Sequence, residues 1–561
     1  MLRPEQRRLV FWLIAAFLVL GAGIGLREPT PPDEPRFAMM AQDMVETGNW
    51  LVPHRGSEIY AEKPPVFMWL QASAYALLGD LRIAFLLPSL LAGVLTLWLV
   101  YDLAKRLWGP QAAMAASVAL ALCLQFGLQA KRAQIDMVVV AMIMGAVWAM
   151  GRHLFLGHSP RWLWFGAFLA GVGTVTKGVG FLPLLMLLPA FILERRGTLP
   201  LPGAPRGPWR LRWSLVLPAF VAGTAVWLAP IAVEVLRNPN PELKTYVAEL
   251  LFKQTGERYV NAWHHIKPWW YYTEVVASLW LPGALLLPWL VPAWWRRLRE
   301  GDPVTITLLA WVVMVLLFFS ASPGKRGVYI FPALPVLCVA AAPLLGALLE
   351  RIGVRRVLFG YGLFLAALLA VVGLAGLVGP DAWSERLAGS RGIADGDVHT
   401  VFVGLLVAGV LSLVAVLATR TKRVVPGLLA LTAIVWTSYG LVLRPALDPS
   451  SSGRTVMAAV AERLPADAEL ALVAWTEQMR LQADRPVTDF GFKASGKAQW
   501  RSGAAWLAEV PATRWVLARA DTVPECVDAA QVIDVGLSNR RGWALVPGTA
   551  VAQRCKASDL R

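Results

Sequence analysis

Long apolar runs recur along most of this chain and limit its fold more than any other feature. Of its 561 residues, 57% are hydrophobic and only 16% are charged, whereas a typical soluble domain has about 25% charged residues. A helix crosses a bilayer with about 20 apolar residues. The sequence therefore predicts a polytopic α-helical membrane protein with thirteen spans, at 9–26, 82–104, 111–129, 136–156, 161–176, 178–195, 213–234, 275–295, 304–321, 330–349, 357–378, 400–418 and 425–443.

The distribution of arginine and lysine predicts the orientation of these spans. Arg3, Arg7 and Arg8 precede the first run, and further arginine clusters follow alternate runs. Basic loops stay in the cytoplasm under the positive-inside rule, so the N-terminus is expected inside. This count requires the short run 65–79 to lie in the outer interface instead of crossing. A net charge of +16 also occurs in nucleic-acid-binding proteins, but these arginines lie in short loops between apolar runs, and we expect no nucleic acid partner.

The polarity of the chain changes at about residue 445. Residues 1–444 form the expected membrane domain, which includes a first outer loop with interfacial helices and a second, long outer loop, at 27–81 and 235–274. Residues 445–561 are expected to form a small α/β domain on the outer face, with a helix at 457–463 and strands at 469–475 and 515–519. In this domain Cys526 and Cys555 form a disulfide if the outer face is oxidising, and two free thiols are the alternative.

Five outer loops bring basic residues to the side of the membrane where the positive-inside rule disfavours them. Such a repeated cost indicates an anionic ligand at this face, and a lipid phosphate fits both the location and the charge. A transporter would place ionisable residues near the middle of the membrane and often shows repeated halves, and the sequence has neither pattern. A membrane scaffold would not explain the basic loops. Their residues are Lys63, Lys131, Arg132, Lys177, Arg258, Lys267, Lys325 and Arg326.

Two acidic positions on the outer loops are candidates for chemistry. Asp33 and Glu34 follow two prolines, and a carboxylate beside the membrane can act as a base or can position a nucleophile. The alternative is that one of them caps a helix at 36–46. Asp136 opens another expected helix, where an N-cap and a functional role are about equally supported.

A divalent metal is a further prediction. Glu62 with His264 and His265 offers ligand types that suit zinc. Adjacent histidines, however, are not a specific ligand spacing.

The basic residues also have a non-functional alternative, because Arg258 and the Lys325–Arg326 pair fit solvated loop charges.

The first outer loop resembles a known family in the segment PDEPRFAMMAQDMVETGNWLVPHRGSEIYAEKPPVFMWLQ. It looks like the corresponding loop of the bacterial aminoarabinose transferases, which are lipid-linked glycosyltransferases of the GT-C fold, as are the protein O-mannosyltransferases. The resemblance covers about residues 1–350 and continues through QIDMVVV, TKGVGFLPLL, ERYVNAWHHIKPWWYY and KRGVYIFPALPVL. Residues 59–65 and the glycines around Lys325 and Arg326 depart from the family pattern without removing a functional residue type.

The resemblance implies roles for individual residues. Asp33 matches the acidic residue that is assigned to catalysis, and Asp136 matches the acidic residue of the second outer loop. Lys63, Arg258 and Tyr329 match positions that hold the carrier phosphate, and Lys325 and Arg326 lie beside them. Glu62 and the His264–His265 pair lie where a metal has been placed in the family. Glu34 and Lys177 are further candidates.

The function implied by this resemblance is an inverting glycosyl transfer on the periplasmic face of the bacterial inner membrane. The expected donor is undecaprenyl-phosphate-linked 4-amino-4-deoxy-L-arabinose, and the expected acceptor is a lipid A phosphate. A protein or another envelope glycan is the alternative acceptor, and a lipid-linked-sugar flippase is the alternative from another functional class. No cofactor is required in this scheme, a zinc ion remains an open prediction, and the other partners are membrane lipids.

Overall fold

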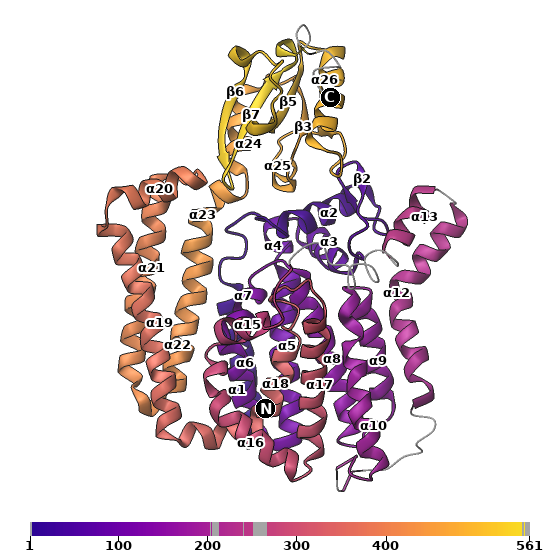
Figure 1. Ribbon diagram of the computed structural model, residues 1–561, viewed down its shortest axis with the longest axis vertical. Helices are drawn as coiled ribbons and strands as arrows, with labels where there is room; N and C mark the ends of the chain where they lie inside the picture. Colours follow the sequence, from indigo (N-terminus) through magenta and orange to yellow (C-terminus); the bar gives the residue numbers. More distant parts are fainter. Residues whose placement is uncertain are drawn as a thin grey trace.

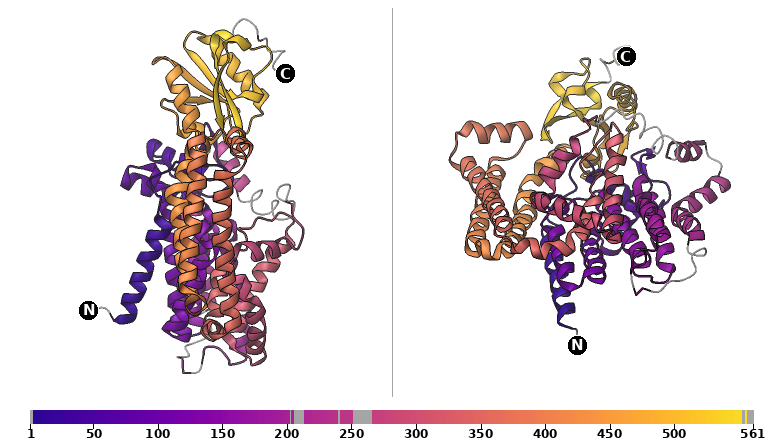
Figure 2. Two further views of the ribbon diagram at one scale, coloured as in Figure 1. Left: turned by 90° about the vertical axis from the view of Figure 1, so that its left-hand side faces the viewer. Right: turned by 60° about the horizontal axis from the view of Figure 1, so that its bottom comes forward.

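The computed structural model describes residues 3–201, 203–204, 213–238, 241–250, 266–551 and 555. A bundle of long helices forms the body of the molecule, and a small α/β domain lies at one end of it (Figure 1). The N-terminus lies toward the opposite end of the bundle, as Figure 2 also shows. We call the end with the α/β domain the outer end and the other the inner end.

Helices make up almost all of the described membrane domain. They are α1 (Pro4–Gly21), α2 (Glu34–Thr47), α3 (Val66–Leu78), α4 (Leu81–Ala84), α5 (Leu87–Trp108), α6 (Pro110–Leu122), α7 (Leu124–Ala130), α8 (Ile135–Leu154), α9 (Arg161–Thr174), η1 (Gly178–Met186), α10 (Leu187–Arg195), α12 (Val216–Arg237), α13 (Pro241–Ala248), α15 (Tyr271–Leu279), η3 (Gly283–Leu286), α16 (Leu287–Arg299), α17 (Pro303–Ala321), α18 (Ala333–Glu350), α19 (Ile352–Val378), α20 (Asp381–Arg391), α21 (Asp395–Thr419), α22 (Val424–Ser438), η5 (Tyr439–Leu443) and α23 (Arg444–Ser451).

Among the described residues, nine helices are long and apolar enough to cross a membrane, or up to eleven if two bent pairs each count as one span. A multi-pass membrane protein is therefore confirmed, while the count of thirteen stays a prediction. The two other expected spans coincide with α1 and α9. Glu5, Arg7 and Arg8 make the first half of α1 polar, and α9 has only 14 residues. The short run 65–79 forms the short apolar helix α3.

Two predicted spans are broken by sharp bends that the apolar pattern does not reveal. The bend between α6 and α7 is 72°, and that between α15 and α16 is 100°. Broken backbone at membrane depth needs other hydrogen-bond partners, and here the two breaks supply them to each other. The Leu124 amide donates to the Leu281 carbonyl over 3.1 Å, and the Trp280 indole donates to the Gln125 side chain over 2.7 Å.

The first outer loop folds over the outer end of the bundle. It contains α2, the short hairpin of β1 (His54–Arg55) and β2 (Glu58–Ile59), and α3 and α4. Helices α2 and α3 pack against each other, and Phe37 and Phe67 meet edge to face with ring centroids 5.2 Å apart. The helix expected at 36–46 is thus α2, which begins two residues earlier.

The outer α/β domain is built on a five-stranded mixed sheet with the order β4-β3-β5-β7-β6. Strand β3 is parallel to β4 and β5, whereas β7 is antiparallel to β5 and β6. The elements predicted at 457–463, 469–475 and 515–519 correspond to α24, β3 and β5, and the structure joins Cys526 to Cys555 in a disulfide. The domain comprises α24 (Arg454–Arg463), β3 (Glu469–Val473), α25 (Glu477–Leu481), β4 (Val487–Asp489), α26 (Gly496–Glu509), β5 (Arg514–Arg519), β6 (Ile533–Ser538) and β7 (Arg541–Pro547).

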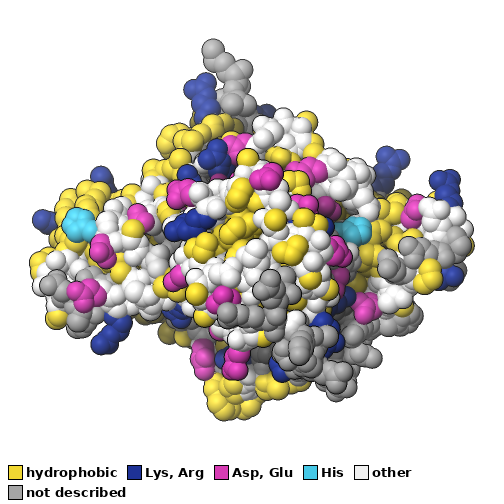
Figure 3. Space-filling model, turned by 90° about the horizontal axis from the view of Figure 1, so that it is seen from above, with side chains coloured by type: hydrophobic (Ala, Val, Ile, Leu, Met, Phe, Trp, Pro, Cys, Tyr) yellow, Lys and Arg dark blue, Asp and Glu magenta, His cyan; other side chains and the backbone are white. Residues whose placement is uncertain are grey.

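Charged contacts attach this domain to the first outer loop. The Glu477 carboxylate of α25 pairs with both Arg36 and Arg55, and the Arg55 guanidinium lies 3.2 Å from the ring centroid of Phe492. The Asp489 carboxylate accepts hydrogen bonds from Ser57. Seen from above, acidic and basic side chains are interspersed over the outer end (Figure 3). A phosphate site must therefore depend on individual loops, because this end is not uniformly basic.

Helices α19, α21 and α22 stand beside the main bundle as a separate arm (Figure 1). Helix α21 packs closely against α19 and also contacts α22. A Cβ atom on Gly409 would lie 2.2 Å from the Ala370 amide nitrogen, so only glycine allows α19 and α21 to approach this closely. Helix α22 in turn contacts α1 and α6 of the main bundle.

Candidate active site

Asp33 lies at the N-cap position of α2, but its side chain does not cap the helix. One carboxylate oxygen, Oδ2, instead accepts a hydrogen bond from Gln134 Nε2 over 2.9 Å and lies 3.4 Å from Arg326 Nη2. About 18% of the side chain is exposed. Asp33 therefore joins the first outer loop to two others and remains accessible.

Asp136 lies in the first turn of α8, where Gln134 occupies the N-cap position without a side-chain hydrogen bond to the helix. The Asp136 carboxylate forms an ion pair with Lys177, which lies just before η1. Both side chains are mostly buried. The N-cap interpretation of Asp136 does not hold, because its carboxylate is occupied by a lysine from another loop.

Tyr329 and Arg326 connect Lys177 back to Asp33, and the backbone of one loop joins Gln134 to Asp136. The Lys177 ammonium lies 5.2 Å from the ring centroid of Tyr329, and the Tyr329 amide donates to the Arg326 carbonyl over 3.0 Å. Arg326 then returns to Asp33. We call this set the outer ring. It consists of Asp33, Gln134, Asp136, Lys177, Tyr329 and Arg326, which come from four different loops.

Glu34, the neighbour of Asp33, belongs to a different and more deeply buried set. Arg27 donates to both of its carboxylate oxygens, over 2.6 and 2.7 Å. The Thr30 and Ala133 amides each donate to it over 3.1 Å, and Arg444 lies 3.7 Å away. We call these five residues the buried knot.

The charge of Glu34 is fixed by this knot. Burial by itself would raise the pKa of Glu34, but Arg27, followed by Arg444 and the Thr30 amide, lowers that pKa to about 2. The contacts of Glu34 are those of a residue that holds the fold together, and no pattern in the sequence indicates Arg27 as its partner.

Two of the residues expected to contact the phosphate, Lys325 and Lys63, donate hydrogen bonds to backbone carbonyls of the outer loops. Lys325 is buried, and its ammonium donates to the carbonyls of Ser322 over 2.6 Å and Lys267 over 3.3 Å. The Lys63 ammonium donates to the Glu62 carbonyl over 3.0 Å. Lys63 lies half-buried before Pro64 and Pro65, at the start of α3. Arg258 lies outside the described residues.

The predicted metal ligands are not brought together within the described part of the chain. Glu62 faces two guanidinium groups, with Arg36 at 3.7 Å and Arg55 at 3.8 Å, which is a setting that favours an ion pair over a metal ion. His264 and His265 lie outside the described residues. Across the described ranges there is no cluster of three His, Cys, Asp or Glu side chains that could hold a metal ion, and the zinc site stays a prediction.

Lys131, another cation of the outer loops, also proves to be structural. Its ammonium donates to the carbonyls of Val19, Leu20 and Ala22 at the C-terminal end of α1, over 2.8 to 3.1 Å. Burial, and to a smaller extent Arg27, lowers the pKa of Lys131 to about 7. Neither Lys131 nor Arg132, the two basic residues of this loop, forms an ion pair within the part of the chain that the structure describes.

Comparison with known proteins identifies the family. A family model described as dolichyl-phosphate-mannose-protein mannosyltransferase matches residues 62–204. An undecaprenyl phosphate-alpha-4-amino-4-deoxy-L-arabinose arabinosyl transferase of Pseudomonas fluorescens is 31% identical over 393 residues, which are 68% of this chain and 64% of that relative. The arabinosyl transferase of the same kind from Aeromonas salmonicida is 31% identical over 387 residues, which are 66% of this chain and 67% of the relative. The chain thus aligns with slightly less than two thirds of the first relative and with two thirds of the second.

The fold is shared with a solved structure over nearly the whole length. The crystal structure of ArnT from Cupriavidus metallidurans bound to undecaprenyl phosphate superposes with a TM-score of 0.74, covering 98% of this chain and 99% of that chain at 20% identity. The predicted GT-C fold is therefore confirmed. Together with the sequence relatives, this shows that the chain belongs to the family of undecaprenyl phosphate-aminoarabinose arabinosyltransferases.

Proposed function

We propose that this protein transfers 4-amino-4-deoxy-L-arabinose from undecaprenyl phosphate to a phosphate of lipid A. The observation that carries the proposal is the outer ring, because it gathers two carboxylates and two cations from four loops at one end of a membrane domain. The printed names of the relatives supply the sugar and the carrier. The two cations of the ring suit a reaction in which a phosphate leaves and an anionic acceptor enters.

In this scheme, cations stabilise the carrier phosphate as the glycosidic bond breaks. Lys177 and Arg326 belong to the ring, and Lys63 lies in the same outer loop as Asp33, just before α3. Packing of α2 on α3 holds Asp33 and Lys63 in one unit. Tyr329 adds a hydrogen-bond donor, and the family resemblance adds Arg258. These residues would position the leaving phosphate and the incoming acceptor relative to each other, as inverting transfer requires.

Asp33 acts in this proposal as a positioning carboxylate for the acceptor or for the amino group of the sugar. A lipid A phosphate is already anionic, so the attacking oxygen needs no strong base. Asp136 keeps the Lys177 ammonium in place through their ion pair. Positioning of this kind can contribute a large part of a rate enhancement, because it removes the entropy cost of bringing reactants together.

An apolar groove below the first outer loop fits the hydrocarbon chain of a lipid. It has a volume of about 520 Å³ and lies between α3, α5, α8 and α9. Leu70, Leu91, Leu95 and Phe165 line it and are exposed. Helix α3 begins three residues after Lys63, so a carrier with its phosphate near Lys63 has an apolar surface directly beneath it.

We place the outer ring on the periplasmic face of the bacterial inner membrane. Two observations support this orientation: the arginine clusters lie at the inner end of the helices, and the outer domain carries the Cys526–Cys555 disulfide, which suits an oxidising compartment. The proposed reaction needs no cofactor, since protein cations face the leaving phosphate. A zinc ion bound by Glu62, His264 and His265 remains an additional proposal, and activity that survives chelation would show that it is dispensable.

The test is mass spectrometry of lipid A from a host that lacks its own transferase. The host carries the intact gene, the Asp33→Asn variant or the Glu46→Gln variant. Glu46 is an exposed carboxylate on α2 outside the ring and serves as the matched control. We expect an aminoarabinose-sized addition with the intact gene and with Glu46→Gln, and none with Asp33→Asn. Absence of the addition with the intact, well-expressed protein would refute the proposed donor and acceptor pair.

A protein acceptor is the second candidate, because the family model that matches residues 62–204 is described by a protein mannosyltransferase. The same host distinguishes the two. Modified envelope proteins without modified lipid A would favour the protein acceptor and leave the outer ring as the site of transfer.

A further inference from the structure

A second large cavity lies far from the outer ring, at the inner end of the molecule. Its volume is about 690 Å³, within the range of about 300–1,000 Å³ of small-molecule sites. It lies where the arm meets the main bundle, between α1, α5, α6, η3 and α18 on one side and α19 and α22 on the other. Nothing in the proposed transfer uses this cavity.

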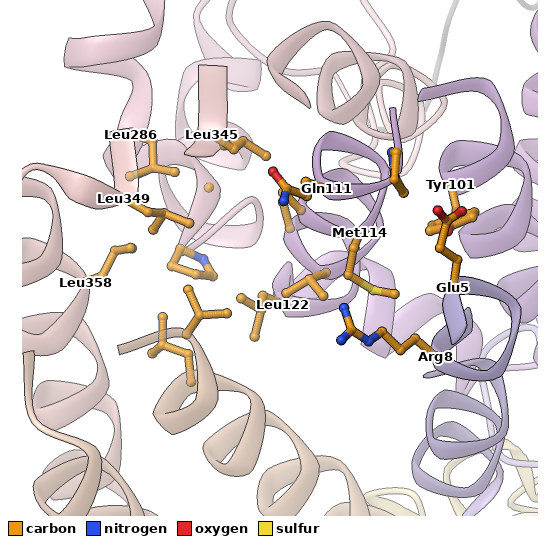
Figure 4. A pocket seen from close by; sticks show the side chains of 18 residues that line it. Glu5, Arg8, Tyr101, Gln111, Met114, Leu122, Leu286, Leu345, Leu349 and Leu358 are labelled. Atoms are coloured by element: carbon orange, nitrogen blue, oxygen red, sulfur yellow. The ribbon is translucent and has the colours of Figure 1, made fainter. Parts of the chain in front are cut away.

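Most of the cavity wall is hydrocarbon. Helix α6 contributes Met114, Val118 and Leu122, which are spaced by four residues and so lie on one face of the helix. Leucines of η3, α18, α19 and α22 close the other side, and four of them, Leu286, Leu345, Leu349 and Leu358, gather at the left of Figure 4. A wall of this composition within a membrane domain suits an acyl chain.

The charged residues that line the cavity lie at its other end, while the polar side chain of Gln111 lies between the two ends in Figure 4. Glu5, Arg8 and Tyr101 lie together at the right of Figure 4, and the Arg8 guanidinium points into the cavity. Glu5 is already paired with Lys105 at 3.0 Å. Arg8 has no ion pair among the residues that the structure describes. The mouth of the cavity therefore presents one uncompensated positive charge.

We propose that this cavity binds an anionic phospholipid of the inner leaflet, with its phosphate at Arg8 and an acyl chain between the arm and the main bundle. Basic pockets between membrane helices on the cytoplasmic side are suited to anionic lipid headgroups. The bilayer supplies such a lipid directly, since Arg8 lies on the second turn of α1 near the inner end. The bound chain would fill the gap between the arm and the main bundle, beside the contacts that α19 and α22 make with the bundle.

The test counts the lipids retained by the purified full-length protein in native mass spectrometry, after reconstitution with phosphatidylglycerol or phosphatidylcholine. Arg8→Glu should weaken retention of one phosphatidylglycerol by about tenfold or more. Arg7→Glu makes the same change of charge at a neighbouring exposed residue that does not line the cavity, and should retain lipid like the wild type. Ala119→Phe, which fills the cavity from α6, should lose the lipid with the Arg8 charge intact.

Equal retention by the Arg8→Glu and Arg7→Glu proteins would overturn the proposal, because basic charge at this end would then attract lipid without a site. Unchanged retention in Ala119→Phe would also overturn it. Equal retention of phosphatidylcholine and phosphatidylglycerol by the wild type would contradict the role of Arg8. Unchanged unfolding temperature of each variant shows that loss of lipid does not reflect loss of fold.

Discussion

Asp33 and Glu34 are adjacent in the sequence but belong to two regions with opposite properties. Glu34 lies in the buried knot, where Arg27 and two backbone amides occupy its oxygens. Asp33 lies in the outer ring, where one oxygen meets Gln134 and, at a longer distance, Arg326. In the knot, protein groups occupy both carboxylate oxygens of Glu34. In the ring, the Asp33 side chain is partly exposed and can contact a ligand.

The difference shows how a membrane protein holds a charged site at its surface. The knot ties the first outer loop to the segment before α8, through Ala133, and to the start of α23, through Arg444. Gln134, the next residue after Ala133, then reaches Asp33. The knot and the ring therefore meet at two adjacent pairs of residues, Ala133–Gln134 and Asp33–Glu34.

The largest expected effect is on the stability of the knot. Glu34→Ala leaves the Arg27 guanidinium buried without a counter-charge, and loss of one partner from a buried pair costs about 3–5 kcal/mol. Denaturant titration of the purified protein measures this loss as a decrease in the free energy of unfolding. A variant with wild-type stability would remove the distinction between the two regions.

The next prediction concerns pH and follows from the lowered pKa of Glu34. A carboxyl whose folded pKa lies below its unfolded value stabilises the fold above the unfolded pKa and loses that effect as the pH falls. A shift from 4.5 to about 2 corresponds to about 3 kcal/mol. The stability difference between the wild type and Glu34→Gln should thus be full above about pH 4.5 and should shrink toward pH 2. A difference that is constant over this window would show that Glu34 is not held ionised by Arg27.

A smaller loss of stability is expected when Lys131 is replaced. Like the residues of the knot, Lys131 is bonded to other parts of the protein. Lys131→Met leaves three carbonyls at the end of α1 without their donor, and such unsatisfied groups cost about 1–3 kcal/mol. The folded fraction of this variant should transfer sugar at the normal rate per molecule. A loss of transfer without a loss of stability would move Lys131 into the functional site.

The smallest effect on stability is expected at Arg326. Its ion pair with Asp33 is partly exposed, so Arg326→Gln should change the free energy of unfolding by less than about 1 kcal/mol. Transfer should nevertheless fall about tenfold, since a charged hydrogen bond to the reacting groups is lost. Assays at saturating donor, with unfolding measured on the same samples, separate the two effects. A large fall in the free energy of unfolding would contradict this prediction, because Arg326 would then stabilise the fold as the residues of the knot do.

The sequence was sufficient to predict a multi-pass membrane protein, and the family resemblance added the GT-C fold. The prediction that Asp33, Asp136, Lys177, Tyr329 and Arg326 share one side of the membrane agrees with their contacts in the outer ring. Charge is costly near a bilayer, so its distribution is informative. The pairings could not be predicted in the same way. Gln134 and Arg326 are 101 and 293 positions from Asp33, and a neutral glutamine carries no signal in a charge pattern.

The same limit applies to the bends and to the contact with the outer domain. The breaks after α6 and α15 depend on backbone hydrogen bonds between distant segments, such as Leu124 with Leu281, and apolar composition is unaffected by them. Glu477 meets Arg36 across 441 positions. Glu34 was a candidate because it is an acidic residue beside Asp33, and only its contacts show that it lies in the buried knot.

The most direct measurement compares Asp33→Asn with Glu34→Gln in purified, reconstituted protein, with sugar transfer and unfolding followed on the same samples. We predict that Asp33→Asn loses transfer by about 100-fold or more, as loss of positioning can cause, and keeps its stability, whereas Glu34→Gln loses stability and keeps transfer in the molecules that remain folded. Normal transfer by a stable Asp33→Asn protein would contradict the assignment of the outer ring as the site of reaction.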